Sequence, residues 1–210
     1  RPPLFPYIIA GFLDVFESPL SIIIFQIFAS ALLVILTYML ALAIYPSYRV
    51  AMVSGFFMAL EPLSIFLNLS FLTETLFTTF FVGGVYFSFL YLKRQSFTDL
   101  VFASALFALA ALTRPIGQFL LVILLGLVTT FFYRNWQTLI KHLFIATAVY
   151  FLILSPWLVR NYVTFGTIGI SSGGFQNVYS DLGATIISIR DKVPWYEAKR
   201  SLEEDFASRH

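Results

Sequence analysis

Long apolar runs without charge constrain this chain more than any other feature of its sequence. The run from residue 19 to residue 45 contains no Asp, Glu, Lys or Arg, and a helix needs about 20 residues to cross the hydrocarbon core of a bilayer. Further runs cover residues 50–69, 75–92, 100–113, 115–133 and 143–159, and Glu61 is their only charged residue. Two of them are short, and the helical pattern extends these back to Phe97 and Leu139. With 59% hydrophobic and 11% charged residues, the chain is predicted to be an all-α, polytopic membrane helix bundle of six spans.

The spans divide the chain into three regions. Residues 1–18 carry three prolines in the first six positions, so we expect a rigid, non-helical opening, because proline removes a backbone donor. Residues 7–16 then form either an extracytoplasmic, interfacial helix or a simple linker. Residues 19–160 form the six-span bundle, whose brief connections favour antiparallel neighbours. Residues 161–210 are expected to start an extracytoplasmic loop, with a surface helix over residues 194–209.

Basic residues are distributed unevenly between the two predicted membrane faces. The connections at one face carry five of them: Arg49, Lys93, Arg94, Arg134 and Lys141. The chain start and the span edges at the other face carry three, namely Arg1, Arg114 and Arg160. Because cytoplasmic loops carry an excess of Lys and Arg, the first face is predicted to be cytoplasmic. Both ends of the chain are then extracytoplasmic.

Several kinds of site lack the residues that they need. The chain has no cysteine, which excludes disulfides and thiolate metal sites. Its net charge of +2 comes from scattered basic residues and gives no indication of nucleic-acid binding. It contains neither a glycine-rich Walker loop nor an Asp-x-Asp sequence, so it has neither of these two devices for holding nucleotides or nucleotide sugars. His142 falls on the cytoplasmic side and His210 is terminal, so we predict no histidine metal cluster.

Two carboxylates fall on the predicted outer face. Glu61 lies near the outer end of the second span, and Glu74 opens the third. A carboxylate at bilayer depth is costly and normally faces a polar cavity or a partner, and Arg114 and Arg160 are the natural partners on the same face. Glu74 also has a structural alternative, in which Thr73 or Ser70 caps the helix of the third span and Glu74 lies in its first turn, where the helix dipole favours it. Both roles stay open for Glu74.

Two arginines lie at span edges on the same face. Arg114 precedes a proline that ends one helix and begins the next. It either snorkels to headgroups or meets an anionic ligand. Arg160 and Asn161 follow a proline and Trp157, where the last span leaves the membrane. A guanidinium at this depth can bind a phosphate with two hydrogen bonds, which an ammonium does less well.

Five motifs follow one another along the chain in a characteristic order. They are Arg1-Pro2-Pro3-Leu4-Phe5-Pro6-Tyr7, Glu61-Pro62 with Leu72-Thr73-Glu74, Leu112-Thr113-Arg114-Pro115, Pro156-Trp157-Leu158-Val159-Arg160-Asn161-Tyr162, and Phe165-Gly166 with Ile170-Ser171-Ser172-Gly173-Gly174. In this order they resemble the polyprenyl-phosphate-sugar-dependent glycosyltransferases. The closer resemblance is to the family 39, dolichyl-phosphate-mannose protein mannosyltransferase-like branch, which includes bacterial lipopolysaccharide-core and aminoarabinose transferases. It covers nearly the whole chain and implies part of a C-type glycosyltransferase fold, with the active site on the extracytoplasmic face.

The resemblance also implies a reaction and roles for individual residues. A sugar would pass from a polyprenyl-phosphate donor to a lipid, glycan or protein acceptor, with inversion at the anomeric carbon. Arg1 and Arg160 match positions that contact the donor phosphate, and Glu74 would be a supporting carboxylate. The further candidates are Arg114, Asn161, Glu61 and Tyr7. No cofactor or complete metal-ligand set is identified, and the resemblance leaves a divalent metal open.

In the family that the chain resembles, the catalytic base is an acidic residue early in the first outer loop, which would precede Arg1. Because the chain begins without Met, we interpret it as an internal fragment that binds parts of a donor without turning it over. The resemblance implies a bacterial or archaeal plasma membrane. A transporter or flippase is the alternative function, since the same charges could line a pathway, and a scaffold without activity is a third. Against transport, the charges gather at one face rather than near the midplane.

Overall fold

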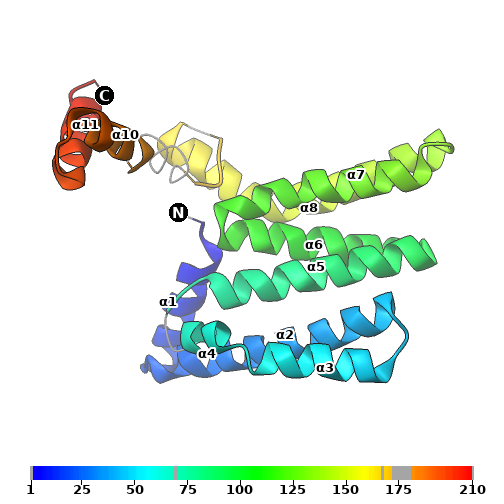
Figure 1. The fold of residues 1–210 in the computed structure, drawn as a ribbon. Coiled ribbons are helices and arrows are strands. Elements are labelled where there is room, and N and C mark those ends of the chain that lie inside the picture. Colours follow the sequence, from blue (N-terminus) through cyan, green and yellow to red (C-terminus); the bar gives the residue numbers. More distant parts are fainter. Residues whose placement is uncertain (1, 69–70, 167, 172–180, 210) are drawn as a thin grey trace. The chain divides into compact units, whose positions relative to one another are not determined.

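The computed structural model describes residues 2–68, 71–166, 168–171 and 181–209. Every regular element in this part is helical, which confirms the predicted all-α class (Figure 1). The chain forms two compact units, of which the first is Pro2–Ile170 and the second begins at Ser171. The first unit holds α1 (Leu4–Phe16), α2 (Leu20–Ile44), α3 (Tyr48–Ala59), α4 (Pro62–Asn68), α5 (Glu74–Arg94), α6 (Phe97–Thr113), the 3-10 helix η1 (Pro115–Phe119), α7 (Leu120–Phe132) and α8 (Trp136–Phe165).

Four helical segments in the described residues are long and apolar enough to cross a membrane. They are α2, α5, Pro115–Phe132 and α8. The helices α1, α3 and α6 are apolar but shorter. Many large apolar side chains of α2 stay exposed, Phe28 among them, as expected for a helix whose solvent is lipid. The prediction of a polytopic membrane helix bundle is confirmed, whereas the number of six spans stays a prediction.

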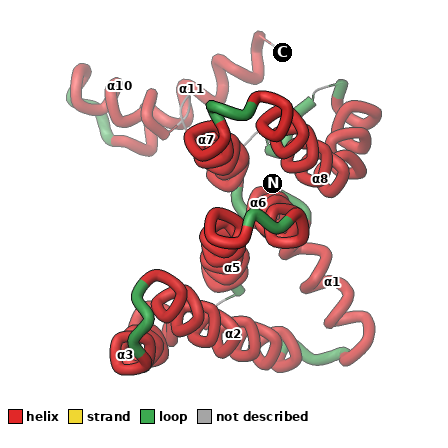
Figure 2. Tube along the Cα trace, turned by 90° about the vertical axis from the view of Figure 1, so that its right-hand side faces the viewer, coloured by secondary structure: helices red, strands yellow, loops and turns green. Residues whose placement is uncertain are grey.

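The helices of the first unit lie side by side, roughly in chain order (Figures 1 and 2). α3 packs on α2, α2 on α5, α5 on α6 and α6 on α8, while α7 packs on α8. α1 contacts α2 and α6. The connections at residues 45–47, 95–96 and 133–135 lie at the end of the bundle opposite α1 (Figure 1). We call these the basic-loop end and the α1 end.

Small residues allow α6 to pack closely against its neighbours. Its fully buried alanines are Ala103, Ala108, Ala110 and Ala111. On α5, Gly84 lies so close to Phe107 of α6 that a Cβ at this position would collide with the ring. Helices in lipid associate mainly through such close van der Waals packing, because the hydrophobic effect does not drive them together. The α5–α6 pair is therefore the tightly packed centre of the bundle.

α1 begins at Leu4, three residues earlier than predicted, and it includes Pro6. Pro6 is the third helical residue, and the first four N–H groups of a helix have no partner within it. A proline there removes no hydrogen bond. The first bond of the helix is made by Tyr7, whose N–H donates to the Pro3 carbonyl at 3.1 Å. The prediction of a non-helical opening was therefore wrong, and the interfacial position of α1 stays a prediction.

At the other helices, prolines and capping residues determine the helix ends more closely than the limits of the apolar runs do. The helix predicted over residues 50–69 is interrupted, because α3 ends at Ala59 and α4 begins at Pro62. Proline lacks an N–H and disfavours helical backbone in the residue before it. α6 begins at Phe97 as predicted. α8 is longer than predicted at both ends, and its N-terminus is capped by Asn135, whose side chain accepts a hydrogen bond from the Thr138 N–H at 3.3 Å.

The second unit contains α10 (Gly183–Asp191) and α11 (Trp195–Arg209). α11 coincides with the helix predicted over residues 194–209, whereas α10 was not predicted. The two helices pack on each other and bury Ala184 and Ala198. An ion pair of 2.7 Å joins Lys199 Nζ to Asp181 Oδ1. The location of this unit at a membrane surface stays a prediction.

Candidate active site

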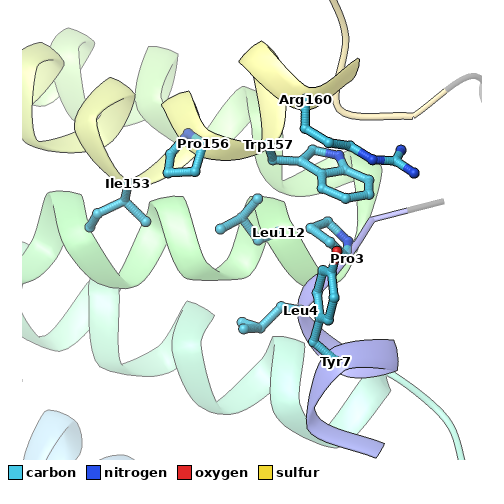
Figure 3. A pocket seen from close by; sticks show the side chains of 8 residues that line it. All are labelled: Pro3, Leu4, Tyr7, Leu112, Ile153, Pro156, Trp157 and Arg160. Carbon is cyan, nitrogen blue, oxygen red and sulfur yellow. The ribbon is translucent and has the colours of Figure 1, made fainter. Parts of the chain in front are cut away.

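A groove opens at the α1 end of the bundle, where α1, α6 and α8 meet (Figure 3). Its volume is about 350 Å³, and its lining residues are Pro3, Leu4, Tyr7, Leu112, Ile153, Pro156, Trp157 and Arg160. The rings of Tyr7 and Trp157 meet edge to face with centroids 6.3 Å apart, a favourable geometry for aromatic pairs. Arg160 is the only charged residue of this lining. We call it the α1–α8 groove.

Pro156 interrupts the hydrogen bonding of α8 beside the groove. As a proline it cannot donate to the carbonyl four residues before it, which belongs to Leu152. The Ser155 hydroxyl donates to that carbonyl instead, at 2.9 Å. Backbone groups freed by proline in membrane helices need such a replacement, because lipid offers none. Ser155 therefore allows α8 to carry a proline at the wall of the groove.

The chain after α8 turns back and fixes the end of this helix. Gly166 ends α8 with a left-handed φ of 69°, which glycine adopts without strain. Two side chains of α8 then hold the returning segment. Trp157 Nε1 donates to the Ile170 carbonyl at 3.0 Å, and Asn161 Nδ2 donates to the Gly169 carbonyl at 2.7 Å. Trp157 is thus oriented by its indole nitrogen while its ring lines the groove.

The Arg160 guanidinium lies at the rim of the α1–α8 groove and is held by neutral groups. Its Cζ lies 4.7 Å from the Trp157 ring centroid and 5.1 Å from that of Phe165, within the range of cation–π attraction. Its Nη1 donates to Asn161 Oδ1 at 3.0 Å. Among the described residues, no carboxylate lies within salt-bridge distance of Arg160. The guanidinium is therefore oriented, and no carboxylate in the described part of the chain neutralises its charge.

Glu74 and Arg114 form an ion pair at this end of the bundle. Arg114 Nη1 donates to Glu74 Oε1 at 2.8 Å, and the two side chains are 39% and 30% exposed in the order Arg114, Glu74. A pair with this exposure contributes little to stability, so its main effect is orientation. Thr73 occupies the N-cap position of α5 but makes no side-chain capping bond, so capping by Thr73 was wrong. Ser70 lies outside the described residues, and Glu74 does lie in the first turn of α5.

The corner that carries Arg114 depends on Gly117. Arg114 ends α6 in an extended conformation with φ −141° and ψ 140°, as expected for a residue before proline. η1 then runs so close to α6 that a Cβ on Gly117 would lie 2.6 Å from the Ala111 backbone. The Tyr150 hydroxyl of α8 donates to the Gly117 carbonyl at 3.4 Å. The sequence does not indicate this role of Gly117, because only the fold shows which backbone the glycine approaches.

The remaining predicted site residues are Glu61 and Arg1. The Glu61 carboxylate accepts hydrogen bonds from the backbone N–H of Leu63, at 3.1 Å, and of Ser64. It therefore caps α4, whose first residue is Pro62. Arg1 lies outside the described residues. The structure thus places Tyr7 and Arg160 in the lining of the groove and Asn161 beside Arg160. It gives Glu61 a capping role and pairs Glu74 with Arg114.

The α1–α8 groove joins an apolar wall to one unneutralised guanidinium. This arrangement suits an amphiphile with an anionic head, because the wall removes apolar surface from water and the guanidinium binds oxyanions. The part of the chain that the structure describes holds no group of three or more His, Cys, Asp or Glu that could bind a metal ion. Trp157 and Phe165, which hold the guanidinium, were present in the sequence motifs but were not predicted to have this role.

Comparison with known proteins identifies the family. Residues 1–159 match the family model described as dolichyl-phosphate-mannose-protein mannosyltransferase, which is about three quarters of the chain and ends one residue before Arg160. No curated protein and no solved structure matches the chain. The family match confirms the family that the ordered motifs resemble, and it agrees with a polytopic bundle of apolar helices. The chain therefore belongs to the dolichyl-phosphate-mannose-protein mannosyltransferase family of membrane glycosyltransferases.

Proposed function

We propose that this protein transfers a sugar from a polyprenyl-phosphate donor to a lipid, glycan or protein acceptor at the extracytoplasmic face, and that the α1–α8 groove holds the donor. One observation carries the proposal: an apolar groove has a single guanidinium at its rim, with no carboxylate partner in the described residues. An isoprenoid phosphate has the matching order, an apolar chain that ends in an anionic group.

The donor phosphate would bind to Arg160. A guanidinium is planar and offers two parallel N–H groups to a phosphate. Low dielectric around the groove strengthens such a bond relative to water. The isoprenoid units next to the phosphate would pack on Leu4, Leu112 and Ile153. In this proposal Trp157 and Asn161 are positioning residues, because they hold the Arg160 side chain.

Two further arginines extend the proposal. The sequence prediction that Arg1 is a second ligand of the donor phosphate is retained. Arg114 is oriented by Glu74 through one of its nitrogen atoms, and a guanidinium carries five N–H donors in total. Donors therefore remain on Arg114 for the acceptor or for the negative charge that develops on the phosphate leaving group of the donor in the transition state. Glu74 in this proposal acts through Arg114 and does not contact the reacting atoms.

The test measures transfer from labelled polyprenyl-phosphate sugars by membranes that contain the full-length protein. Arg160→Glu should abolish transfer while leaving membrane insertion intact. Arg160→Gln should weaken donor binding about 10- to 100-fold, the usual loss of a hydrogen-bonded charge. Arg134→Glu is the matched control, since it reverses an exposed arginine at the basic-loop end and should transfer normally.

Two results would contradict the proposal in different ways. Normal transfer by Arg160→Glu would remove Arg160 from the donor site while leaving the enzyme class in place. If the wild-type full-length protein released no labelled sugar from any polyprenyl-phosphate donor, the donor class itself would be wrong. Insertion is measured separately, by protease protection, so a failure to insert is not read as a loss of transfer.

A further inference from the structure

A second groove lies at the basic-loop end, between α2 and α5. Its volume is about 260 Å³, and its lining residues are Met39, Leu42, Ala43, Tyr86, Leu90, Lys93 and Arg94. It shares no residue with the α1–α8 groove. Figure 2 looks onto this end of the bundle and shows α2 and α5 as neighbours. The α2–α5 groove is therefore a separate site in the same helical unit.

The lining of the α2–α5 groove changes from apolar to cationic along the helices. Met39, Leu42 and Leu90 form apolar walls within α2 and α5. Lys93 and Arg94 are the last two residues of α5. Both helices are long and apolar enough to cross a membrane, so we expect the walls at acyl-chain depth and the two cations at headgroup depth. A phospholipid has the same order of apolar chain and charged head.

The two cations are available to an anion. Lys93 Nζ donates to the Ala43 carbonyl near the end of α2 and lies 4.7 Å from the Phe89 ring centroid. An ammonium has three donors, so two remain for a ligand. Arg94 is exposed, and in the described parts of the chain no carboxylate lies within salt-bridge distance of it.

The charge around the groove has one sign. The basic-loop end carries Arg49, Lys93, Arg94, Arg134 and Lys141. Between residues 45 and 50, 93 and 99, and 133 and 142, the sequence contains one acidic residue, Asp99. The Asp99 side chain is buried and does not neutralise the surface. This end of the bundle is complementary to an anionic lipid surface.

We propose that the α2–α5 groove binds one anionic glycerophospholipid. One acyl chain lies against Met39, Leu42 and Leu90, and the phosphate accepts hydrogen bonds from Arg94 and Lys93. Basic pockets between membrane helices bind anionic headgroups in this way. The proposal does not depend on the proposed transfer reaction, because it concerns the other end of the bundle and a lipid that is not consumed.

Native mass spectrometry of the detergent-solubilised protein tests the proposal. The protein is titrated with dioleoyl-phosphatidylglycerol or with dioleoyl-phosphatidylcholine, and bound lipid is counted. The wild type should retain one phosphatidylglycerol in preference to phosphatidylcholine. Arg94→Gln should weaken this binding about fivefold, the effect of one cation at an anionic lipid surface, and Arg94→Lys should restore most of it. Arg134→Gln is the matched control, with the same charge change at the same end, and should bind like wild type.

Each alternative occupant gives a different result. Equal losses in Arg94→Gln and Arg134→Gln would show diffuse attraction by the basic-loop end and would overturn the site. Equal retention of phosphatidylcholine would leave no role for the two cations. Competition by glycerol 3-phosphate at equal concentration would indicate a site for free phosphates, and preferential displacement by a polyprenyl phosphate would assign the groove to the donor lipid.

The acyl-chain contact is tested by Leu42→Trp, which fills the groove without altering its charge. This variant should abolish retention of phosphatidylglycerol, and unchanged retention would overturn the proposed acyl-chain contact.

Discussion

Gly117 provides the sharpest test of how the corner at Arg114 is built. In Gly117→Ala, the new Cβ would lie 2.6 Å from both the Cα and the backbone nitrogen of Ala111. Ordinary van der Waals contact begins at 3.4 Å, so η1 and α6 must separate by the difference, about 0.8 Å. The atoms on the other side are backbone, and no rotation of a side chain can relieve the contact. Either the corner at Arg114 moves, or η1 and α6 pack less closely.

The expected cost follows from two opposing effects. Overpacking of this kind costs about 1–3 kcal/mol. Replacing glycine by alanine returns about 0.4–1 kcal/mol, because the unfolded chain becomes less flexible. The net loss is roughly 1–2 kcal/mol, and for a chain of this length that corresponds to a fall of roughly 2–8 °C in the apparent melting temperature. A lower melting temperature of Gly117→Ala would therefore show that η1 lies this close to α6.

The assay heats the protein in detergent and measures the fraction that remains monodisperse by size-exclusion chromatography. Gly126→Ala is the matched control, because the same substitution on α7 places a Cβ where nothing lies within 4 Å. This variant should melt at the wild-type temperature or slightly above it. If Gly117→Ala melted like Gly126→Ala, η1 would not approach α6 as described, and the orientation of Arg114 would need another explanation.

Two double-mutant cycles test other contacts of the same end by denaturant unfolding in detergent. Glu74→Gln and Arg114→Gln should show a coupling of about 0.5–1 kcal/mol, since both side chains are more than a quarter exposed; strictly additive losses would argue against the ion pair. Ser155→Ala should lower the free energy of unfolding by about 0.5–1.5 kcal/mol, because the Leu152 carbonyl loses its replacement donor. In the Pro156→Ala background, residue 156 has a backbone N–H that can donate to the Leu152 carbonyl, so Ser155→Ala should lower the free energy of unfolding much less. An equal loss in both backgrounds would contradict this role of Ser155.

Hydropathy predicted most of the helices, because the apolar residues that place a helix in lipid are neighbours in the sequence. Runs of uncharged residues predict where a helix lies in lipid, and α2, α5 and α6 agree with the prediction at most of their ends. The exceptions have local chemical causes. Pro6 is compatible with the first turn of α1, and Asn135 starts α8 earlier than its apolar run. α10 was missed because its residues carry no strong apolar run.

The candidate site was less predictable, because sequence gives the depth of a residue more readily than its direction around a helix. Glu74, Arg114 and Arg160 were predicted on one face, but the sequence does not say which arginine meets Glu74. That choice depends on packing between α5 and α6, where Gly84 and small residues set the distance. The use of Asn161 to hold Arg160 depends in turn on the chain returning after Gly166. Both are consequences of tertiary structure.

Proline sets the depth of the charged residues at the α1 end. Arg114 stands directly before a proline and leaves the helical conformation there, so its side chain departs from α6 at the level where α5 begins with Glu74. Glu61 also precedes a proline and caps the helix that this proline starts. In lipid, a chain reversal exposes backbone groups that need polar partners, and a charged or capping side chain beside the proline supplies them. In this chain, a charge followed by proline therefore marks the helix ends at Arg114 and Glu61, and the break at Glu61 lies within a run that hydropathy alone predicts as one helix.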